Sequence, residues 1–471
     1  MPIFPPKPVV TSWDVFDTLV ARFTPHPHDV FHTVEKSQNF PSFVRRRMDA
    51  QAGLDRRGAP YVLYDIYRQM VAEGMAAAEA RVLLRAELAA ERNQLFPIRR
   101  NVARVDPLDL IISDMYLSPE MISAVLFETC DLHTHRPIIR SNWGKNTGTI
   151  WPLVLNEYVI RRHVGDNPNS DIEIPSRFKI ACELVQDSRL TPWEMKLHEL
   201  GLGQLGLIQR EVRLRTIPPD AGRFHAAVVG PYLTILACFA MHLVHRFGAD
   251  AEFAFLSRSS DELCRVFVSM FPDIPTRSLD ISRRLAGDER MASMFAFGIT
   301  PATVFVDMVG SGRSFFRFSE STGNPGRALI LFAFLEGVLS GTERKKARKR
   351  QEAGRFTHVF NIEAAGKQWP FEHLLQAHYP PVSRAGLDLR SGGIVRVFGE
   401  AELDRVEADL VAWKSAAVTE FVRTARQRGL TDPGDAPVNA AMDNALQAIL
   451  TDKDIMAPFT SFAAREQMDP A

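Results

Sequence analysis

The sequence contains few cysteines, and they are far apart. Four cysteines occur in 471 residues, and none of them forms a CxxC pair. This scarcity argues against a disulfide framework and against a zinc site built from paired cysteines. We therefore expect a protein of a reducing compartment, the cytoplasm.

An excess of charge of either sign is also missing. The chain carries 56 basic and 56 acidic residues, so its formal net charge is zero. Such a balance gives no whole-chain attraction to nucleic acids or to anionic membranes. The local exception is the basic run RKKARKR at 344–350, which is typical of a solvated helix face. Nucleic-acid binding through this run is a minor hypothesis.

No long uninterrupted apolar segment is present. The N-terminus lacks a basic segment followed by an apolar stretch, so no signal peptide is expected. The longest apolar run, 226–241, contains Gly230 and Pro231. It is shorter than the roughly 20 residues that a membrane span needs. We predict a buried helix there and no association with a membrane.

The length and the pattern of the chain favour two α/β domains. A chain of 471 residues exceeds the size at which a single hydrophobic core stops growing. Strand and helix patterns alternate in both halves, which predicts two open parallel sheets. We expect a first domain at 1–215, a second α/β domain at 216–400 and a helical extension at 401–471.

Individual elements follow from apolar periodicity and capping residues. The region from about 25 to 105 shows helical periodicity and no strand signal, and Ser118 is expected to cap a helix that begins at Pro119. The segment 185–220 resembles a linker. Strands are predicted at 8–16, 108–118, 136–142, 161–173 and 178–184, and in the second half at 251–260, 302–314, 327–336 and 355–363.

Polar side chains stand where the strands of the first half end. In a parallel sheet, the carboxyl ends of the strands meet at one edge, where ligands bind. Carboxylates, a small hydroxyl and a lysine at one edge suit phosphoryl transfer with Mg²⁺. The simpler reading is that strand-end aspartates only form turns. The candidate residues are Asp14, Asp17, Ser113, Asp114, Lys145, Asp166 and Asp171.

These residues lie in motifs that resemble the haloacid dehalogenase-like (HAD) hydrolase superfamily. The stretches DVFDTL (14–19), LIISD (110–114) and HVGDNPNSD (163–171), with Lys145 between the last two, carry the resemblance. It implies a Rossmann-like domain whose helical region at 25–105 is a type 1 cap. It also implies that Asp14 is the nucleophile and a Mg²⁺ ligand, and that the Phe16 carbonyl is a second ligand. Ser113 would hold a phosphoryl oxygen, Lys145 would balance charge, and Asp166 and Asp171 would hold Mg²⁺.

The sequence departs from this pattern at Phe16. Phosphatases of the superfamily have a second aspartate two residues after the nucleophile, as general acid and base. Phenylalanine cannot transfer a proton, and Asp17 is one residue further along. Three outcomes stay open: Asp17 substitutes, another group or the substrate does the acid work, or the site binds with little turnover.

A glycine-rich loop follows a strand of the second half. Glycines and a helix N-terminus let backbone N–H groups approach an anion. The simpler reading is a tight strand-to-helix turn. The stretch resembles the phosphoribosyl pyrophosphate loop of type I phosphoribosyltransferases, except that Met308 replaces an acidic residue. The resemblance implies a ligand site formed by Arg258, Asp307, Gly310, Ser311, Gly312, Arg313 and Ser314.

We therefore expect a Mg²⁺-dependent, phosphatase-type hydrolase or phosphotransferase that works through an aspartyl-phosphate. Its substrate would be a phosphorylated small molecule, a nucleotide or sugar phosphate, and the second domain would bind phosphoribosyl pyrophosphate or a nucleotide. The alternative is a catalytically degraded nucleotide sensor or effector subunit, favoured by Phe16 and Met308. Either reading is compatible with a homo-oligomer or a protein partner.

Overall fold

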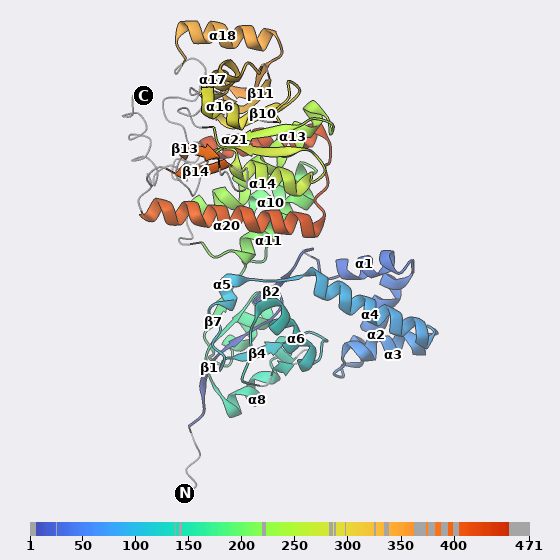
Figure 1. Ribbon diagram of the computed structural model, residues 1–471. Helices are drawn as coiled ribbons and strands as arrows, with labels where there is room; N and C mark the ends of the chain where they lie inside the picture. The colour runs from blue at the N-terminus through green and yellow to red at the C-terminus, as the bar shows by residue number, and fades with distance from the viewer. Residues whose placement is uncertain are drawn as a thin grey trace. The chain divides into compact units, whose positions relative to one another are not determined.

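The computed structural model divides the chain into two compact units. The first comprises residues 1–191 and 213–217, and the second comprises 192–212 and 218–471. Both units are mixed α/β, with parallel sheets flanked by helices (Figure 1). The structure describes residues 6–24, 26–136, 138–140, 144–218, 223–281, 286, 289–296, 298–324, 326–333, 339–361, 374, 382–387, 394–398 and 405–451.

A five-stranded parallel sheet forms the centre of the first unit, in the order β5-β4-β1-β6-β7. The strand β1 is central, and its residues from Val10 to Trp13 are all buried, including the polar Thr11 and Ser12. Trp13 pairs with Ile111 on one side and with Val164 on the other, so the three strands end at nearly the same level. The strands are β1 (Val9–Trp13), β4 (Leu110–Ser113), β5 (Ile139–Arg140), β6 (Val159–Gly165) and β7 (Cys182–Leu184).

Short helices connect these strands. Ser118 accepts a hydrogen bond from the Met121 backbone N–H at 3.3 Å and caps the helix that begins at Pro119, as predicted. The connecting helices are α5 (Arg99–Val102), α6 (Pro119–Cys130), α7 (Gly144–Thr147), α8 (Ile150–Glu157), the π-helical turn η1 (Pro168–Glu173) and α9 (Ile174–Ser176).

Four helices are inserted between two short antiparallel strands, β2 (Val20–Arg22) and β3 (Leu95–Pro97). They gather beside the sheet in Figure 1 and share one apolar core with it. The expected helical region is confirmed, but the prediction that it holds no strand was wrong. β3 is three residues long and ends in a proline, too short to show an alternating pattern. The helices are α1 (Asp29–Ser37), α2 (Phe43–Arg57), α3 (Leu63–Ala72) and α4 (Ala77–Gln94).

The second unit has its own parallel sheet, in the order β12-β11-β10-β8-β9. The predicted second open sheet is thus confirmed. The edge strand β9 was not predicted, because TRSL is too polar to stand out. The hairpin of β13 (Val382–Leu387) and β14 (Ile394–Phe398) was also missed. The sheet strands are β8 (Phe253–Leu256), β9 (Thr276–Leu279), β10 (Val304–Gly310), β11 (Arg327–Ala333) and β12 (Phe356–Asn361).

Helices of the second unit pack around this sheet. Helix α13 packs against α21, and α14 packs against α20. Lys414 of α20 donates to the Glu262 carboxylate of α14 at 3.0 Å, and both side chains are buried. The helices are α10 (Pro192–Glu199), α11 (Gly203–Arg215), α12 (Arg223–Ala227), the π-helical turn η2 (Val228–Tyr232), α13 (Leu233–Phe247), α14 (Asp261–Met270), α16 (Glu289–Phe295), α17 (Arg313–Thr322), α18 (Gly341–Glu352), α20 (Arg405–Arg428) and α21 (Asp435–Thr451).

One prediction about the chain between the two sheets was wrong. The segment 185–220 is not a linker, because it contains helix α10 and helix α11. Its glycines, GLGQLG, masked a helical row of buried residues that includes Leu205, Ile208 and Val212. In the first sheet, the strand predicted at 161–173 is present as β6, although it begins earlier, at Val159, and the polar segment after it forms the π-helical turn η1.

The predicted buried helix at 226–241 is confirmed. Residues Phe224–Phe247 form one apolar stretch long enough to cross a membrane, and 83% of its most apolar window is buried inside the protein. Such a high buried fraction is typical of a helix in a protein core. The π-helical turn η2 accommodates Pro231, whose ring cannot fit a regular helix.

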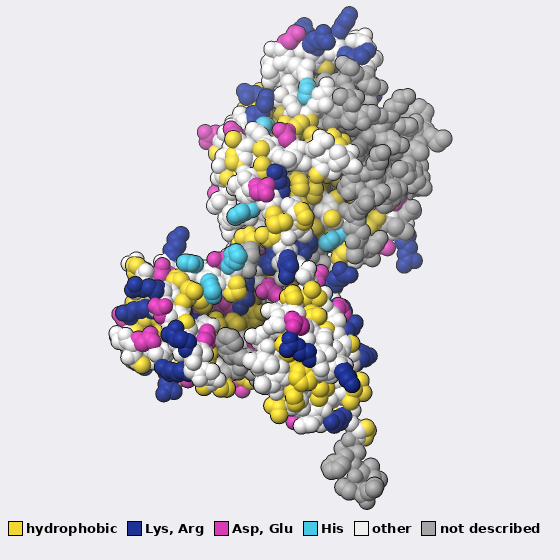
Figure 2. Space-filling view, turned by 180° about the vertical axis from the view of Figure 1, so that it is seen from behind, with side chains coloured by type: hydrophobic (Ala, Val, Ile, Leu, Met, Phe, Trp, Pro, Cys, Tyr) yellow, Lys and Arg dark blue, Asp and Glu magenta, His cyan; other side chains and the backbone are white. Residues whose placement is uncertain are grey.

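The predicted solvated helix face at 344–350 corresponds to α18. Figure 2 shows Lys and Arg side chains gathered at the end of the molecule where this helix lies. Among these side chains, Lys346 and Arg350 each form an ion pair with Glu320 at 3.3 Å.

The buried ion pair of the helical insertion gives a stability prediction. Arg47 donates to Glu87 at 2.9 Å, and both side chains are almost fully buried. Arg47→Met leaves the Glu87 charge unpaired, so we expect the unfolding free energy of this unit to fall by about 3–5 kcal/mol. The double variant Arg47→Met/Glu87→Gln removes both charges and should lose much less, as measured by chemical denaturation. Equal losses in the two variants would contradict this account.

Candidate active site

The carboxyl ends of β1, β4 and β6 bring the predicted residues of the first unit together. Asp14 directly follows β1, Ser113 ends β4, and Asp166 directly follows β6. Lys145 comes from α7 and Asp171 from η1. All five line one cavity of about 480 Å³, which also reaches the helical insertion.

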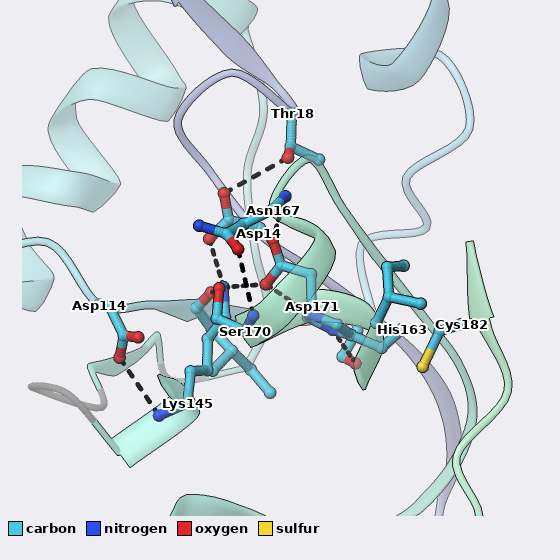
Figure 3. A network of polar contacts seen from close by, with 12 residues as sticks. Asp14, Thr18, Asp114, Lys145, His163, Asn167, Ser170, Asp171 and Cys182 are labelled. Carbon is cyan, nitrogen blue, oxygen red and sulfur yellow. Dashed lines mark hydrogen bonds and ion pairs between the residues drawn. The ribbon is translucent and has the colours of Figure 1, made fainter. Parts of the chain in front are cut away.

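The ammonium group of Lys145 joins two of the carboxylates. Its Nζ lies 2.5 Å from Asp14 Oδ1 and 2.6 Å from Asp171 Oδ1 (Figure 3). The same Nζ donates to the Ile112 carbonyl at 3.4 Å. Only 2% of the Lys145 side chain is exposed. Burial by itself would lower the pKa of Lys145, but Asp14 and Asp171 together raise it, so the amine stays charged.

A histidine behind the site fixes Asp171. It is the first residue of the motif HVGDNPNSD, but no role was predicted for it. His163 Nε2 lies 3.1 Å from Asp171 Oδ1, and its Nδ1 lies 2.8 Å from the Ser12 hydroxyl. Burial lowers the pKa of His163, which favours the neutral ring. Because a carboxylate only accepts, Nε2 carries the proton and Ser12 donates to Nδ1. Burial would raise the pKa of Asp171, but Lys145 and His163 lower it below its ordinary value.

The loop after β6 is shaped to deliver Asp171. The Asn167 side chain accepts from the N–H groups of Asn169 (2.9 Å) and Ser170 (3.2 Å), which closes the turn. The Asn167 N–H donates to Asp171 Oδ2 at 3.0 Å. A Cβ on Gly165 would lie 2.3 Å from the Asp171 carboxylate, so only glycine fits at the end of this strand.

Three carboxylates are close enough to share a cation. Oxygen atoms of Asp14, Asp166 and Asp171 lie within 4.8 Å of one another, and no other such cluster of three occurs among the described residues. Burial, then the neighbouring aspartates, raises the pKa of Asp166 to about 8. Burial also raises that of Asp14 to about 7, although Lys145 opposes it. An all-oxygen donor set with excess negative charge fits a hard divalent cation such as Mg²⁺.

Short polar contacts position the remaining groups around Asp14. Thr18, which the sequence analysis did not single out, donates to Asp14 Oδ2 at 3.3 Å. The Ser113 hydroxyl accepts from the Met115 N–H at 3.2 Å and lies on the cavity wall. Asp114 accepts from the Lys145 backbone N–H at 3.3 Å, which anchors the start of α7.

Phe16 and Asp17 both line the cavity. Asp17 has a φ of 58°, in the left-handed region, where it opens a tight turn. Its N–H donates to the Val20 carbonyl at 2.6 Å, which closes that turn. The turn therefore leaves both side chains at the cavity, although they are adjacent in sequence.

In the second unit, Asp307 lies in the middle of β10. Ser259 donates to Asp307 Oδ1 at 2.7 Å, so the loop after β8 and the strand β10 meet as expected for neighbouring parallel strands. Burial raises the pKa of Asp307 to about 6. Met308 is fully buried and belongs to the core.

The glycine-rich loop after β10 starts helix α17. Gly312 has a φ of 76°, and a Cβ there would lie 3.0 Å from the Phe356 ring, so this position needs glycine. Arg313 pairs with Glu343 at 3.1 Å. The other predicted residues of this loop are Gly310 at the end of β10, the buried Ser311 and the half-buried Ser314, and Arg258 is half-buried after β8.

The chain was compared with protein-family models and with curated protein sequences. No protein-family model matches the chain, and no curated protein matches its sequence. The chemistry of the site therefore rests on its own geometry.

The raised pKa values predict how Mg²⁺ and pH act together. Asp14 and Asp166 have folded pKa values of about 7 and about 8, against 3.8 ordinarily. They contribute stability that is present below pH 3.8 and is lost as pH rises through the folded values. A bound cation offsets this loss only when the carboxylates are ionised. We expect Mg²⁺ to raise the thermal midpoint of the unit much more at about pH 8.5 than at about pH 5.5.

The control for this measurement is KCl at matched ionic strength, which should give no such difference. An equal Mg²⁺ effect at both pH values would contradict the cation site.

Proposed function

We propose that the first unit carries out Mg²⁺-dependent phosphoryl transfer from a phosphorylated small molecule, with Asp14 as the nucleophile. The observation that carries the proposal is the position of Asp14. It lies at the end of the central strand, in contact with a buried ammonium group and within 4.8 Å of two further carboxylates. A purely structural turn residue would not be surrounded by such costly buried charges.

Each residue of the site has a role in this reaction. Asp14 attacks phosphorus and forms an aspartyl-phosphate, and the contact from Thr18 helps to hold its other oxygen. Lys145 neutralises charge on the transferring group, and the Ser113 hydroxyl holds one of its oxygens. Asp14, Asp166, Asp171 and the Phe16 carbonyl would hold Mg²⁺. When bound, Mg²⁺ supplies charge neutralisation at the phosphoryl oxygens.

The proposal explains why Asp171 and Lys145 are arranged as they are. His163 and the Asn167 N–H occupy Asp171 from behind, so its charge is fixed in place before substrate binds. Lys145, held between Asp171 and Asp14, needs no rearrangement to face an incoming phosphoryl group. Such preorganisation is what makes electrostatic stabilisation effective in enzymes.

Replacing the nucleophile gives the direct test. Asp14→Asn keeps the shape of the side chain but removes its charge, so we expect Mg²⁺-dependent turnover of a phosphate-ester and anhydride panel to fall by more than about 10³-fold. The matched control is Asp49→Asn, on the exposed side of α2, which should retain full turnover. Unchanged turnover in Asp14→Asn would refute the proposal.

A second candidate function is nucleotide binding without turnover, as in a sensor or effector subunit. The observation that favours it lies in the second unit, where Met308 is fully buried at the position that the phosphoribosyltransferase pattern gives to an acid. Asp307, which accepts a hydrogen bond from Ser259, is then the acidic residue of this loop that could bind a ribose or a metal. We propose that this unit binds a phosphate-bearing ligand such as a nucleotide or phosphoribosyl pyrophosphate.

Calorimetry separates the two candidates. Nucleotides and phosphoribosyl pyrophosphate are titrated into wild type and into Asp307→Asn, beside a turnover assay on the same samples. Binding that weakens by about tenfold in the variant, without turnover of any phosphate compound in wild type, supports the sensor. Mg²⁺-dependent turnover that is independent of Asp307 supports the enzyme.

A further inference from the structure

The backbone after β1 presents two side chains to the same cavity. Asp14 and Phe16 are two residues apart, just after β1 ends, and Phe16 forms an isolated bridge with Val20. Both line the cavity, so a phosphoryl group at Asp14 brings its leaving group into a space with the Phe16 ring on its wall.

A guanidinium group covers that ring. The Cζ atom of Arg22 lies 4.6 Å from the centre of the Phe16 ring, and Arg22 also lines the cavity. Arg22 is 95% buried, and its Nη2 lies 2.7 Å from Glu91 Oε1. The ion pair with Glu91 fixes the guanidinium in place. This part of the wall therefore offers an apolar ring and a guanidinium group that Glu91 holds in place.

Neither group can protonate a departing oxygen. Phenylalanine has no exchangeable proton, and arginine does not give its proton up in proteins. Burial raises the pKa of Tyr61 and of Tyr116, which also line the cavity, so both phenols hold their protons more tightly. The Tyr61 hydroxyl already donates to Asp55 at 2.5 Å.

The consequence concerns the basicity of the leaving group. An alkoxide is a strong base and leaves slowly unless an acid protonates it. A carboxylate or a phosphate is a weak base, and it leaves as an anion that a nearby cation stabilises. The Phe16–Arg22 wall suits the second kind of leaving group and not the first.

We propose that the substrate is an anhydride of phosphoric acid, either an acyl phosphate or a phosphoanhydride, and not an alkyl phosphate monoester. This inference rests on the proposed phosphoryl transfer at Asp14. It narrows the substrate class and assigns Phe16 and Arg22 to the recognition of an anionic leaving group.

The reaction balances without a proton donor. An oxygen of Asp14 forms a bond to phosphorus while the bond from phosphorus to the leaving oxygen breaks, and that oxygen keeps the electron pair as a carboxylate or phosphate. Water then attacks the phosphorus of the aspartyl-phosphate. Asp14 leaves as a carboxylate next to Lys145, and the protons of the water pass to the released phosphate and the solvent.

The first test uses the wild-type, full-length protein with Mg²⁺. Acetyl phosphate, pyrophosphate, a series of aryl phosphates of rising leaving-group pKa, and glycerol phosphate are compared by kcat/KM. We expect kcat/KM to fall steeply along the series, by at least about 10²-fold from acetyl phosphate to glycerol phosphate. A flat dependence, with glycerol phosphate within about tenfold of acetyl phosphate, overturns the inference, because Asp17 or His28, which also line the cavity, would then supply the proton.

The second test places an acid on the wall. We expect Phe16→Asp to raise the ratio of glycerol phosphate to acetyl phosphate turnover by at least about tenfold, whereas Phe16→Leu leaves the ratio low. An equal ratio in both variants counts against the assignment of Phe16, and the wild-type series stands even if Phe16→Asp fails to fold. Turnover of monoesters alone refutes the inference but leaves the proposed function intact, and no turnover of any compound refutes both.

Discussion

The first unit depends on a buried ammonium group between two carboxylates. Lys145 lies within 2.6 Å of both Asp14 and Asp171, and almost none of it reaches solvent. A buried charge of this kind is expensive unless its partners are held in place. The surrounding structure does so: His163 and the Asn167 N–H hold Asp171, Thr18 contacts Asp14, and Ile112 accepts from the ammonium itself.

The same charges make the site suitable for a cation and a phosphoryl group. Lys145 pairs with Asp14 and Asp171. Burial and the acidic neighbours raise the pKa of the third carboxylate, Asp166, to about 8. In the proposed reaction a divalent cation would relieve that repulsion, and the phosphoryl group would then meet a balanced site. The Phe16 and Arg22 side chains, which line the same cavity, would face the leaving group.

The two units share an architecture but differ in the polar contacts at the ends of their strands. In the first, Asp14 after β1 and Asp171 of η1 both contact the buried ammonium group of Lys145. In the second, Asp307 contacts Ser259, whereas Arg313 at the start of α17 pairs with Glu343 of α18. This contrast is why we place the chemistry in the first unit and ligand binding in the second.

The sequence by itself determined that strands and helices alternate in both halves, that the helix at 226–241 is buried, and that Asp14, Ser113 and Asp166 stand at strand ends. Apolar runs and the polar residues that follow them are local patterns. It did not predict the role of His163, because the contact with Asp171 forms only when the turn after β6 folds back. It did not predict α11, because glycines interrupt the helical pattern, and it did not predict β3, because three residues are too few to show a strand pattern. Whether Asp17 reaches the cavity, and that Arg22 covers Phe16, was decided only by the tertiary structure, because both depend on a turn and on a strand pair that close through long-range packing.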